Sequence, residues 1–312
     1  MENLILSFNV VLPLFLMIVV GYVLKVLRVY DEHTISGMNK LVFKFFLPLL
    51  LFINVYQTDV AGVFDPKLMV FAIVGVLGAF LSAWLIIVLV EKDNRKRGVL
   101  IQGIFRSNFV IFGIPVTTSL FGSEATGAAA LLVAVIVPMF NMLSVVILEI
   151  YRGSRIDVPK ILKGIITNPL IIGSVTGLLF LLFGVKIPVI LEKTISDLSK
   201  VTTPLALVIL GASFTFGSVR GNAKQILIGV LGKLVIVPAI CLSLAILIGI
   251  RGVGLAILMS LFGSPTAVSS FSMAKQMDGD EDLASHLVVL GSMLSVVTMF
   301  FWIFIFKQGG LM

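Results

Sequence analysis

Long apolar runs alternate with short polar stretches along the whole chain. The longest polar stretches are EKDNRKR at 91–97, RGSRIDVPK at 152–160 and MDGDED at 277–282. Each apolar run is close to the roughly 20 residues that an α-helix needs to cross a bilayer. The pattern therefore predicts an all-α membrane protein with ten transmembrane helices, at residues 8–27, 35–56, 67–90, 98–122, 126–150, 161–184, 196–218, 224–249, 252–276 and 283–306.

Basic residues divide unequally when alternate loops are assigned to the two sides of the membrane. Thirteen fall on one side: Lys25, Arg28, Lys92, Arg95, Lys96, Arg97, Arg152, Arg155, Lys160, Lys163, Arg220, Lys224 and Lys275. Six fall on the other: Lys67, Lys186, Lys193, Lys200, Arg251 and Lys307. Because cytoplasmic loops are enriched in Lys and Arg, the first side is predicted to be cytoplasmic. Both termini then face the outside or the periplasm, and we expect a multi-pass protein of the inner or plasma membrane.

The composition agrees with a chain whose solvent is lipid. Of 312 residues, 59% are hydrophobic and 12% are charged, whereas soluble domains carry about 25% charged residues. The net charge of +7 does not indicate nucleic-acid binding, because most basic residues lie in short loops between apolar runs. The single cysteine, Cys241, cannot form an internal disulfide.

The two halves of the chain share an ordered set of matches. Pro13 and Gly21 are spaced like Pro169 and Gly177, and the string MLSVV occurs near the end of each half. We therefore predict one integrated membrane domain made of two repeats, 1–155 and 156–312. Each repeat holds five predicted spans, an odd number, so the second repeat has to enter the membrane with the opposite orientation. Such inverted repeats are typical of secondary transporters.

Glycine and proline occur together in the middle of the fourth and ninth predicted spans, in the strings FGIPV and FGSPT. Proline removes a helical hydrogen bond, and glycine permits a sharp bend. The sequence predicts helix breaks at Gly113–Pro115 and Gly263–Thr266, with Ser264 as the N-cap of a half-helix that begins at Pro265. Simple proline kinks are the alternative.

Three stretches resemble the auxin efflux carrier family, which includes plant auxin carriers and bacterial permeases for malate or malonate. They are SNFVIFGIPV at 107–116, TPLALVILGASF at 203–214 and the stretch 264–298 that begins SPTAVSSF. The resemblance covers essentially the whole chain. It implies a five-plus-five inverted repeat like that of bile-acid symporters, with the fourth and ninth helices crossing at their breaks. It also implies a scaffold part, a mobile transport part and, as one expected partner, a second copy of the chain.

The resemblance further implies that Asn108 lies in the substrate site, because the family has an asparagine before the break of the fourth helix. Auxin itself is not implied, because the fifth and sixth spans are joined by only about ten residues. We expect residues around the two breaks to line the substrate cavity: Asn108, Phe112, Gly113, Ile114, Pro115, Asn141, Gly263, Ser264, Pro265, Thr266 and Ser269.

All sixteen acidic residues fall in loops or at the ends of the predicted spans, and the charges deeper inside the spans are all basic: Lys40, Lys44, Arg106 and Lys233. Intramembrane charge is costly and usually functional, so this bias favours an anionic substrate. Lys40, Arg106 and Lys233 are the candidates for a charge or coupling role. Alternatively, Lys40 and Lys44 extend toward the cytoplasmic surface, and Arg106 pairs with Glu149. Lys233 has no counterpart in the first repeat, and it is a candidate to fill a cation site known from related folds.

The sequence thus predicts a secondary transporter that moves small organic anions, such as malate, malonate or aromatic acids, by alternating access. Without a carboxylate at depth, potential-driven uniport is the favoured mechanism. Sodium- or proton-coupled symport and a non-transporting membrane sensor are the alternatives. The chain has two histidines and none of the usual catalytic or nucleotide-binding motifs. We therefore predict no enzymatic activity, no cofactor and no metal ion, and the substrate and the lipid bilayer as partners.

Overall fold

The computed structural model describes residues 2–57, 65–152, 158–215 and 217–312. The side chains of residues 2–11, 114, 115, 119, 123–128, 130 and 160 lie outside this description. Within the described chain, every regular element is a helix. The first half contains α1 (Glu2–Val26), α2 (Glu32–Leu41), η1 (Val42–Phe46), α3 (Leu47–Tyr56), α4 (Pro66–Val90), α5 (Asn94–Phe105), η2 (Phe109–Gly113), α6 (Ile114–Phe121) and α7 (Ser123–Tyr151).

The second half has a similar order of long and interrupted helices. It contains α8 (Val158–Ile166), α9 (Pro169–Leu182), α10 (Val189–Lys200), α11 (Thr202–Ser213), η3 (Arg220–Asn222), α12 (Ala223–Leu231), η4 (Gly232–Ile236), α13 (Val237–Leu247), α14 (Gly252–Gly263), α15 (Ser269–Gln276) and α16 (Glu281–Gln308). The elements η1, η2 and η4 are π turns. The turns η1 and η4 run directly into helices whose first turn contains Pro48 or Pro238.

Several helical segments are suited to a membrane by their length and composition. Among the described residues, six are long and apolar enough to cross it: Glu32–Tyr56, Pro66–Val90, Leu131–Tyr151, Val189–Ser213, Arg220–Leu247 and Glu281–Gln308. Three shorter apolar helices are Leu12–Val26, Pro169–Leu182 and Gly252–Gly263. These segments support a multi-pass membrane protein.

Both of the spans that the sequence predicts to be broken are interrupted. In the ninth span, residues 264–268 separate α14 from α15. This gap includes most of the break predicted at Gly263–Thr266. Ser264 is the C-cap of α14, with an extended backbone, so its prediction as an N-cap is wrong. An N-cap also has a non-helical backbone, so the prediction fails because no helix begins at Pro265: α15 begins at Ser269. The backbone between the two helices bonds to the fourth span instead, with the carbonyl oxygen of Pro265 accepting from the N–H of Asn108.

The break in the fourth span is displaced from its predicted position. It lies at residues 106–108, before η2, and not at Gly113–Pro115. Gly113 ends the π turn η2, and Pro115 stands in the first turn of α6. Proline is tolerated in the first turn of a helix, where its missing N–H matters least. The helix therefore continues through the motif that was expected to break it.

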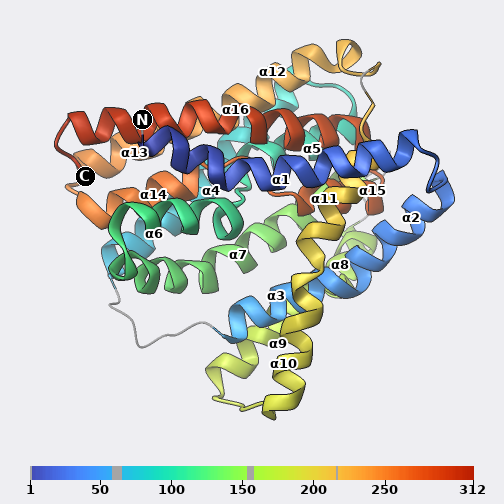
Figure 1. The fold of residues 1–312 in the computed structure, drawn as a ribbon, viewed down its shortest axis with the longest axis horizontal. Helices are drawn as coiled ribbons and strands as arrows, with labels where there is room; N and C mark the ends of the chain where they lie inside the picture. The colour runs from blue at the N-terminus through green and yellow to red at the C-terminus, as the bar shows by residue number, and fades with distance from the viewer. Residues whose placement is uncertain (1, 58–64, 153–157, 216) are drawn as a thin grey trace.

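Two pairs of helices approach each other at backbone distance, α1 with α11 and α3 with α9 (Figure 1). A Cβ atom on Gly21 would lie 2.0 Å from the carbonyl oxygen of Val208, and one on Gly177 would lie 2.7 Å from that of Phe52. Gly177 follows Gly21 in the sequence by the same interval as Val208 follows Phe52. Gly21 and Gly177 occupy equivalent positions in the two predicted repeats, and their contact partners Val208 and Phe52 are equivalent as well.

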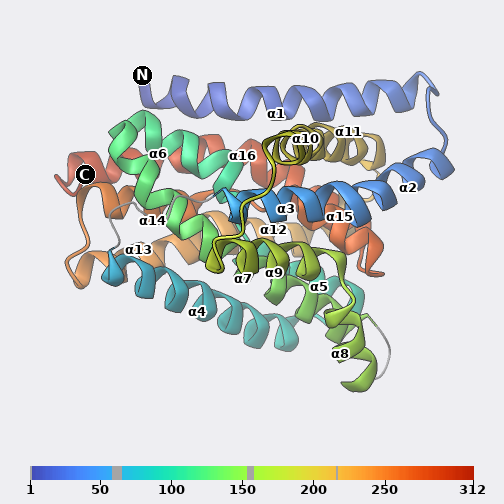
Figure 2. The same cartoon turned by 90° about the horizontal axis from the view of Figure 1, so that it is seen from below.

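The turns between helices gather at the two ends of the molecule. At one end, Lys96 Nζ donates to Asn222 Oδ1 at 2.8 Å and joins two Lys- and Arg-rich turns. At the other end, Lys67 Nζ donates to the carbonyl oxygen of Ile248 at 2.6 Å. The start of α1 and the end of α16 lie together at this second end (Figures 1 and 2). Each of these bonds joins turns that the sequence assigns to one side.

Candidate functional site

The two interrupted spans meet at their breaks. The backbone N–H of Asn108 donates to the carbonyl oxygen of Pro265 at 2.8 Å, and Thr266 Oγ1 donates to the carbonyl oxygen of Gly103 at 2.7 Å. Irregular backbone at membrane depth needs such partners, because lipid offers none. Each break therefore satisfies backbone groups of the other, and the crossing is a single structural unit.

The helices on either side of the crossing pack closely. Thr117 Oγ1, on α6, donates to Ser260 Oγ on α14 at 2.6 Å. A Cβ atom on Gly113 would lie 2.9 Å from the carbonyl oxygen of Ser260, so a larger residue at this position would push α14 away. The glycine of FGIPV thus serves close helix approach and not the break itself.

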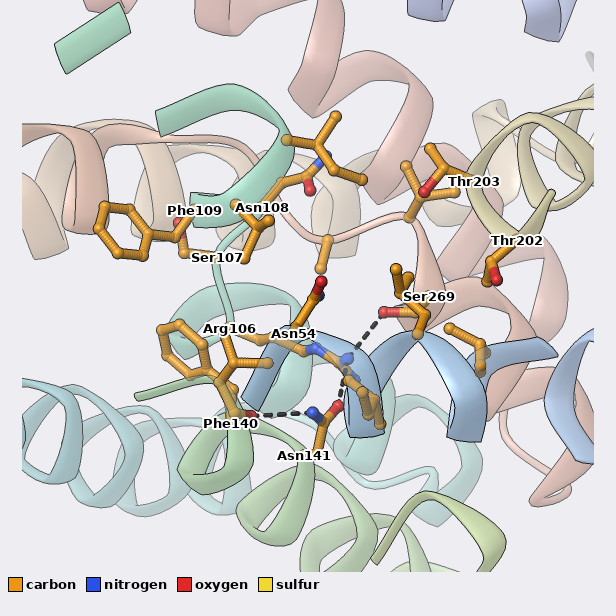
Figure 3. Close-up of a pocket in the computed structure, with 18 of the residues that line it drawn as sticks. Asn54, Arg106, Ser107, Asn108, Phe109, Phe140, Asn141, Thr202, Thr203 and Ser269 are labelled. Atoms are coloured by element: carbon orange, nitrogen blue, oxygen red, sulfur yellow. Dashed lines mark hydrogen bonds between the residues drawn. The ribbon is translucent and has the colours of Figure 1, made fainter. Parts of the chain in front are cut away.

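A cavity of about 90 Å³ lies beside the crossing (Figure 3). This volume is several times the roughly 10–15 Å³ that one water needs on a comparable measure. Its polar lining residues are Asn54, Arg106, Ser107, Asn108, Asn141, Thr202, Thr203 and Ser269. Apolar side chains, among them Leu47 and Phe140, supply the rest of the wall. The mixture of apolar walls and few polar groups is typical of a small-molecule site.

Arg106 is the charged group of this cavity. Its residue is 4% exposed, and its guanidinium donates to Asn141 Oδ1 and Ser269 Oγ, each at 2.7 Å, and to the sulfur of Met273. Asn141 Nδ2 donates to the carbonyl oxygen of Val137 at 2.8 Å, which turns the amide oxygen toward Arg106 (Figure 3). All three partners of the guanidinium are electrically neutral.

The alternative in which Arg106 pairs with Glu149 is wrong. Glu149 pairs with Arg152, with Oε1 3.0 Å from a guanidinium nitrogen. Within the described part of the chain, no carboxylate lies within salt-bridge distance of Arg106. A buried cation without a counter-charge is costly, so a bound anion would relieve that cost.

Two further polar groups of the cavity are unused. Asn108 is 5% exposed, and its Nδ2 has no hydrogen-bond partner among the described residues; the same holds for the buried Ser107 Oγ. Buried donors are nearly always paired in folded proteins, by protein, water or ligand. These two groups are therefore available to a molecule in the cavity.

The structure brings together only part of the predicted site. Asn108, Asn141 and Ser269 line the cavity with Arg106. Six other predicted residues are buried around the crossing but do not line the cavity: Phe112, Gly113, Gly263, Ser264, Pro265 and Thr266. Ile114 and Pro115 open α6, but their side chains lie outside the described residues.

Three polar lining residues come from α3 and α11, which were not expected to contribute: Asn54, Thr202 and Thr203. Their signal was weak. Asn54 is a polar residue at membrane depth, and the two threonines precede Pro204 at the start of a resemblance stretch. Nothing in one sequence indicates that α3 and α11 face the crossing, because that is decided by how helices pack.

The other two charge candidates lie elsewhere. Lys233, in η4, is 1% exposed, and its Nζ donates to the carbonyl oxygen of Phe262 at 3.2 Å, in the last turn of α14. Cations are stabilised at helix C-termini, so this ammonium is compensated by α14. Lys40 lines a separate cavity. Across the described residues, no three His, Cys, Asp or Glu side chains lie close enough to share a metal ion, and the expected absence of a cofactor stays a prediction.

A family model and several known proteins match this chain over almost its full length. The family model described as "Membrane transport protein" matches residues 6–303. An uncharacterized transporter from Methanothermobacter thermautotrophicus is 26% identical over 95% of this chain and 97% of its own. An uncharacterized transporter from Methanocaldococcus jannaschii is 22% identical over 94% and 97%, and YfdV of Escherichia coli K12, also an uncharacterized transporter, is 21% identical over 94% and 96%.

The family model covers every residue that forms the crossing and the cavity beside it. Its description and the names of the relatives agree with the resemblance found in the sequence. The chain belongs to the membrane transport protein family, the auxin efflux carrier-like transporters.

Proposed function

We propose that this protein is a secondary transporter that carries small organic anions, such as malate or malonate, by alternating access. One observation carries the proposal: the buried Arg106 faces a cavity and has only neutral partners among the described residues. Guanidinium groups bind carboxylates through two parallel hydrogen bonds. An anion is therefore the ligand class that this cavity favours.

The neighbouring groups suit a carboxylate. Asn108 Nδ2 and Ser107 Oγ are buried donors without partners in the described chain, and Thr203 adds a hydroxyl group to the lining. The hydroxyl of Thr202 donates to the carbonyl oxygen of Phe46 at 3.0 Å, so it is not a free donor. The N-terminal end of α15 begins at Ser269, beside the guanidinium. Apolar side chains such as Leu50 would contact the carbon skeleton of the substrate.

For the architecture we propose ten spans in a five-plus-five inverted repeat. The equivalent contacts of Gly21 and Gly177 support it, as do hydrogen bonds that join only turns assigned to the same side. We assign α1, α3, α9 and α11 to the scaffold, because these helices interlock at backbone distance. The crossing helices and their neighbours form the mobile part. Both termini then lie outside the cell or in the periplasm.

For energy coupling we propose potential-driven uniport. The described lining of the cavity includes no Asp or Glu that could carry a proton, and the ammonium of Lys233 lies at the end of α14, where a coupling cation would otherwise bind carbonyl oxygens. Sodium- or proton-coupled symport is the alternative. A sensor that binds without transport is a further alternative, and counterflow of a radiolabelled anion in proteoliposomes separates it from a carrier.

Thermal-shift measurement against a panel of mono- and dicarboxylates tests the anion site, because a ligand stabilises the state that it binds. At least one anion of the panel should raise the melting temperature. Arg106→Gln and Asn108→Ala should each weaken its binding by about 10-fold or more, the value of one charge-assisted hydrogen bond.

Asn39→Ala is the matched control. Asn39 is also buried, and its amide has no hydrogen-bond partner among the described residues, but it does not line this cavity. It should leave the anion affinity within about twofold of wild type. Unchanged affinity in a folded Arg106→Gln protein would reject the proposed site.

A further inference from the structure

A second and larger cavity, of about 370 Å³, lies at the Lys- and Arg-rich end of the molecule. Lys40 and Lys44 supply one wall from α2 and η1, and Glu149 and Arg152 supply another from the C-terminal end of α7. Gln276 closes it at the end of α15. Gly164 of α8 and the start of α9 complete the lining, so segments from both halves of the chain converge here.

The charges around this cavity do not cancel. Glu149 is held by Arg152 at 3.0 Å, and Arg152 also pairs with Asp278 at 2.8 Å. Neither Lys40 nor Lys44 forms a salt bridge with any described residue. Like charges four residues apart on a helix destabilise it. A bound anion between the two ammonium groups would remove that repulsion.

The start of α9 adds to the same positive potential. Asn168 is its N-cap, with Oδ1 accepting the N–H of Leu170 at 2.9 Å, and Pro169 is its first residue. Both residues line the cavity. A helix of 14 residues presents a partial positive charge at its N-terminus. Two lysines and this helix end therefore act on one cavity.

The two cavities lie in line along shared helices. On α15, Ser269 lines the first cavity and Gln276 lines the second; on α7, Asn141 lines the first and Glu149 the second. Between them, the sulfur of Met273 accepts a hydrogen bond from Arg106. An anion that left the second cavity along α15 would thus meet the guanidinium of Arg106.

We propose that the second cavity is an anion-binding vestibule, in which Lys40 and Lys44 bind the carboxylate substrate before it reaches Arg106. This inference rests on the proposed function, and it adds a second site for the same class of ligand. The Arg106–Met273 contact is the barrier that separates the two sites in this state of the protein.

Thiol labelling measures the potential in this cavity without knowledge of the substrate. Gln276→Cys is introduced in a Cys241→Ala background, which removes the only native cysteine. The protein is reconstituted in phosphatidylcholine nanodiscs, and the rates of an anionic and a cationic methanethiosulfonate reagent are compared. Adding Lys40→Gln and Lys44→Gln should lower the anionic-to-cationic rate ratio by about 10-fold, because local potential sets the reagent concentration.

A control carries Lys92→Gln and Lys224→Gln, two exposed lysines of the same end that do not line the cavity. It should leave the ratio within about twofold of its starting value, because charges beyond a Debye length are screened. An unchanged ratio in the Lys40 and Lys44 double variant would overturn the vestibule.

The occupant is tested by protection of Gln276→Cys from a neutral thiosulfonate. Malate or malonate should slow the labelling, and should still do so in an Arg106→Gln protein, because the vestibule is separate from the first site. Protection only by phosphatidylglycerol in the nanodisc would instead identify a lipid phosphate, and would overturn the proposal, as would no protection at all. The proposed function is tested separately, by the thermal shift of an Arg106→Gln protein that lacks the Gln276→Cys substitution. If the anion raises the melting temperature of that protein as much as it raises that of the wild type, the proposed function fails whatever the labelling shows.

Discussion

The missing side chains of Gly21 and Gly177 allow two helix pairs to meet at backbone distance. At Gly21 the partner atom is the carbonyl oxygen of Val208, and a Cβ atom there would come within 2.0 Å. Even alanine cannot fit unless the helices separate. In a membrane, where apolar burial gives helices little reason to associate, small residues make close van der Waals packing the main attraction. These glycines therefore bear directly on the stability of the scaffold.

Gly21→Ala and Gly177→Ala should each lower stability, by about 1–3 kcal/mol, because overpacking forces the helices apart. The expected result is a lower melting temperature and a lower folded yield in detergent. Gly78→Ala is the matched control. Gly78 lies in α4 with nothing within 4 Å of its Cβ position, so alanine should be neutral or stabilising by about 0.5–1 kcal/mol. Equal melting temperatures in all three variants would contradict the interlock.

Among the helices, a few hydrogen bonds at the crossing join the broken fourth span, α5 and α6, to the broken ninth span, α14 and α15. Thr266 Oγ1 bonds to the carbonyl oxygen of Gly103, near the C-terminal end of α5. The last carbonyls of a helix have no partner within it. The threonine of the ninth span therefore completes the fourth span, and a change in one broken helix is transmitted to the other.

Thr266→Val keeps the shape of the side chain and removes its hydroxyl. It should destabilise the protein by about 1–3 kcal/mol, because the Gly103 carbonyl would be buried without that partner. Anion affinity should stay within about twofold, since Thr266 is not part of the cavity lining. Thr194→Val, at an exposed position on α10, is the control and should leave the melting temperature unchanged. Lost affinity with unchanged stability would place Thr266 in the binding site instead.

At the scale of the whole molecule, two polar ends enclose an apolar middle that carries buried basic groups. Arg106 and Lys233 are the deeply buried cations among the described residues. Under the proposed function, the charge of Arg106, which faces the first cavity, favours a bound anion without a co-transported cation. A negative-inside potential then drives the anion outward, with about 2.3 kcal/mol per charge per 100 mV.

Flux in proteoliposomes tests this coupling. An anion from the binding panel is loaded inside, with sodium absent and pH equal on both sides, and a potassium gradient with valinomycin sets the potential. An inside-negative potential of 100 mV should shift the equilibrium distribution roughly 50-fold per charge toward the outside. Transport that ignores the potential but requires a sodium or proton gradient would replace uniport with symport.

The sequence predicted some features because they depend on local patterns. The break around Pro265 follows from the restriction that proline places on Ser264. The break before Asn108 could not be placed in the same way. Its partners are Pro265 and Thr266, which are more than a hundred residues away in the chain. The motif at Gly113 and Pro115 indicated the right helix but the wrong turn.

Sequence alone was enough to identify lipid as the solvent and a membrane protein as the class, because hydrophobicity and loop charge are summed over many residues and need no knowledge of packing. The family followed from the three stretches that resemble auxin efflux carriers. Tertiary structure alone decided which neighbours Arg106 has. Glu149 was one of two expected partners, with the substrate as the other, yet Glu149 is held by Arg152, and the guanidinium donates to Asn141 and Ser269. Hydrogen bonds act over about 3 Å, so the acceptors that a side chain can reach depend on the rotation and approach of whole helices.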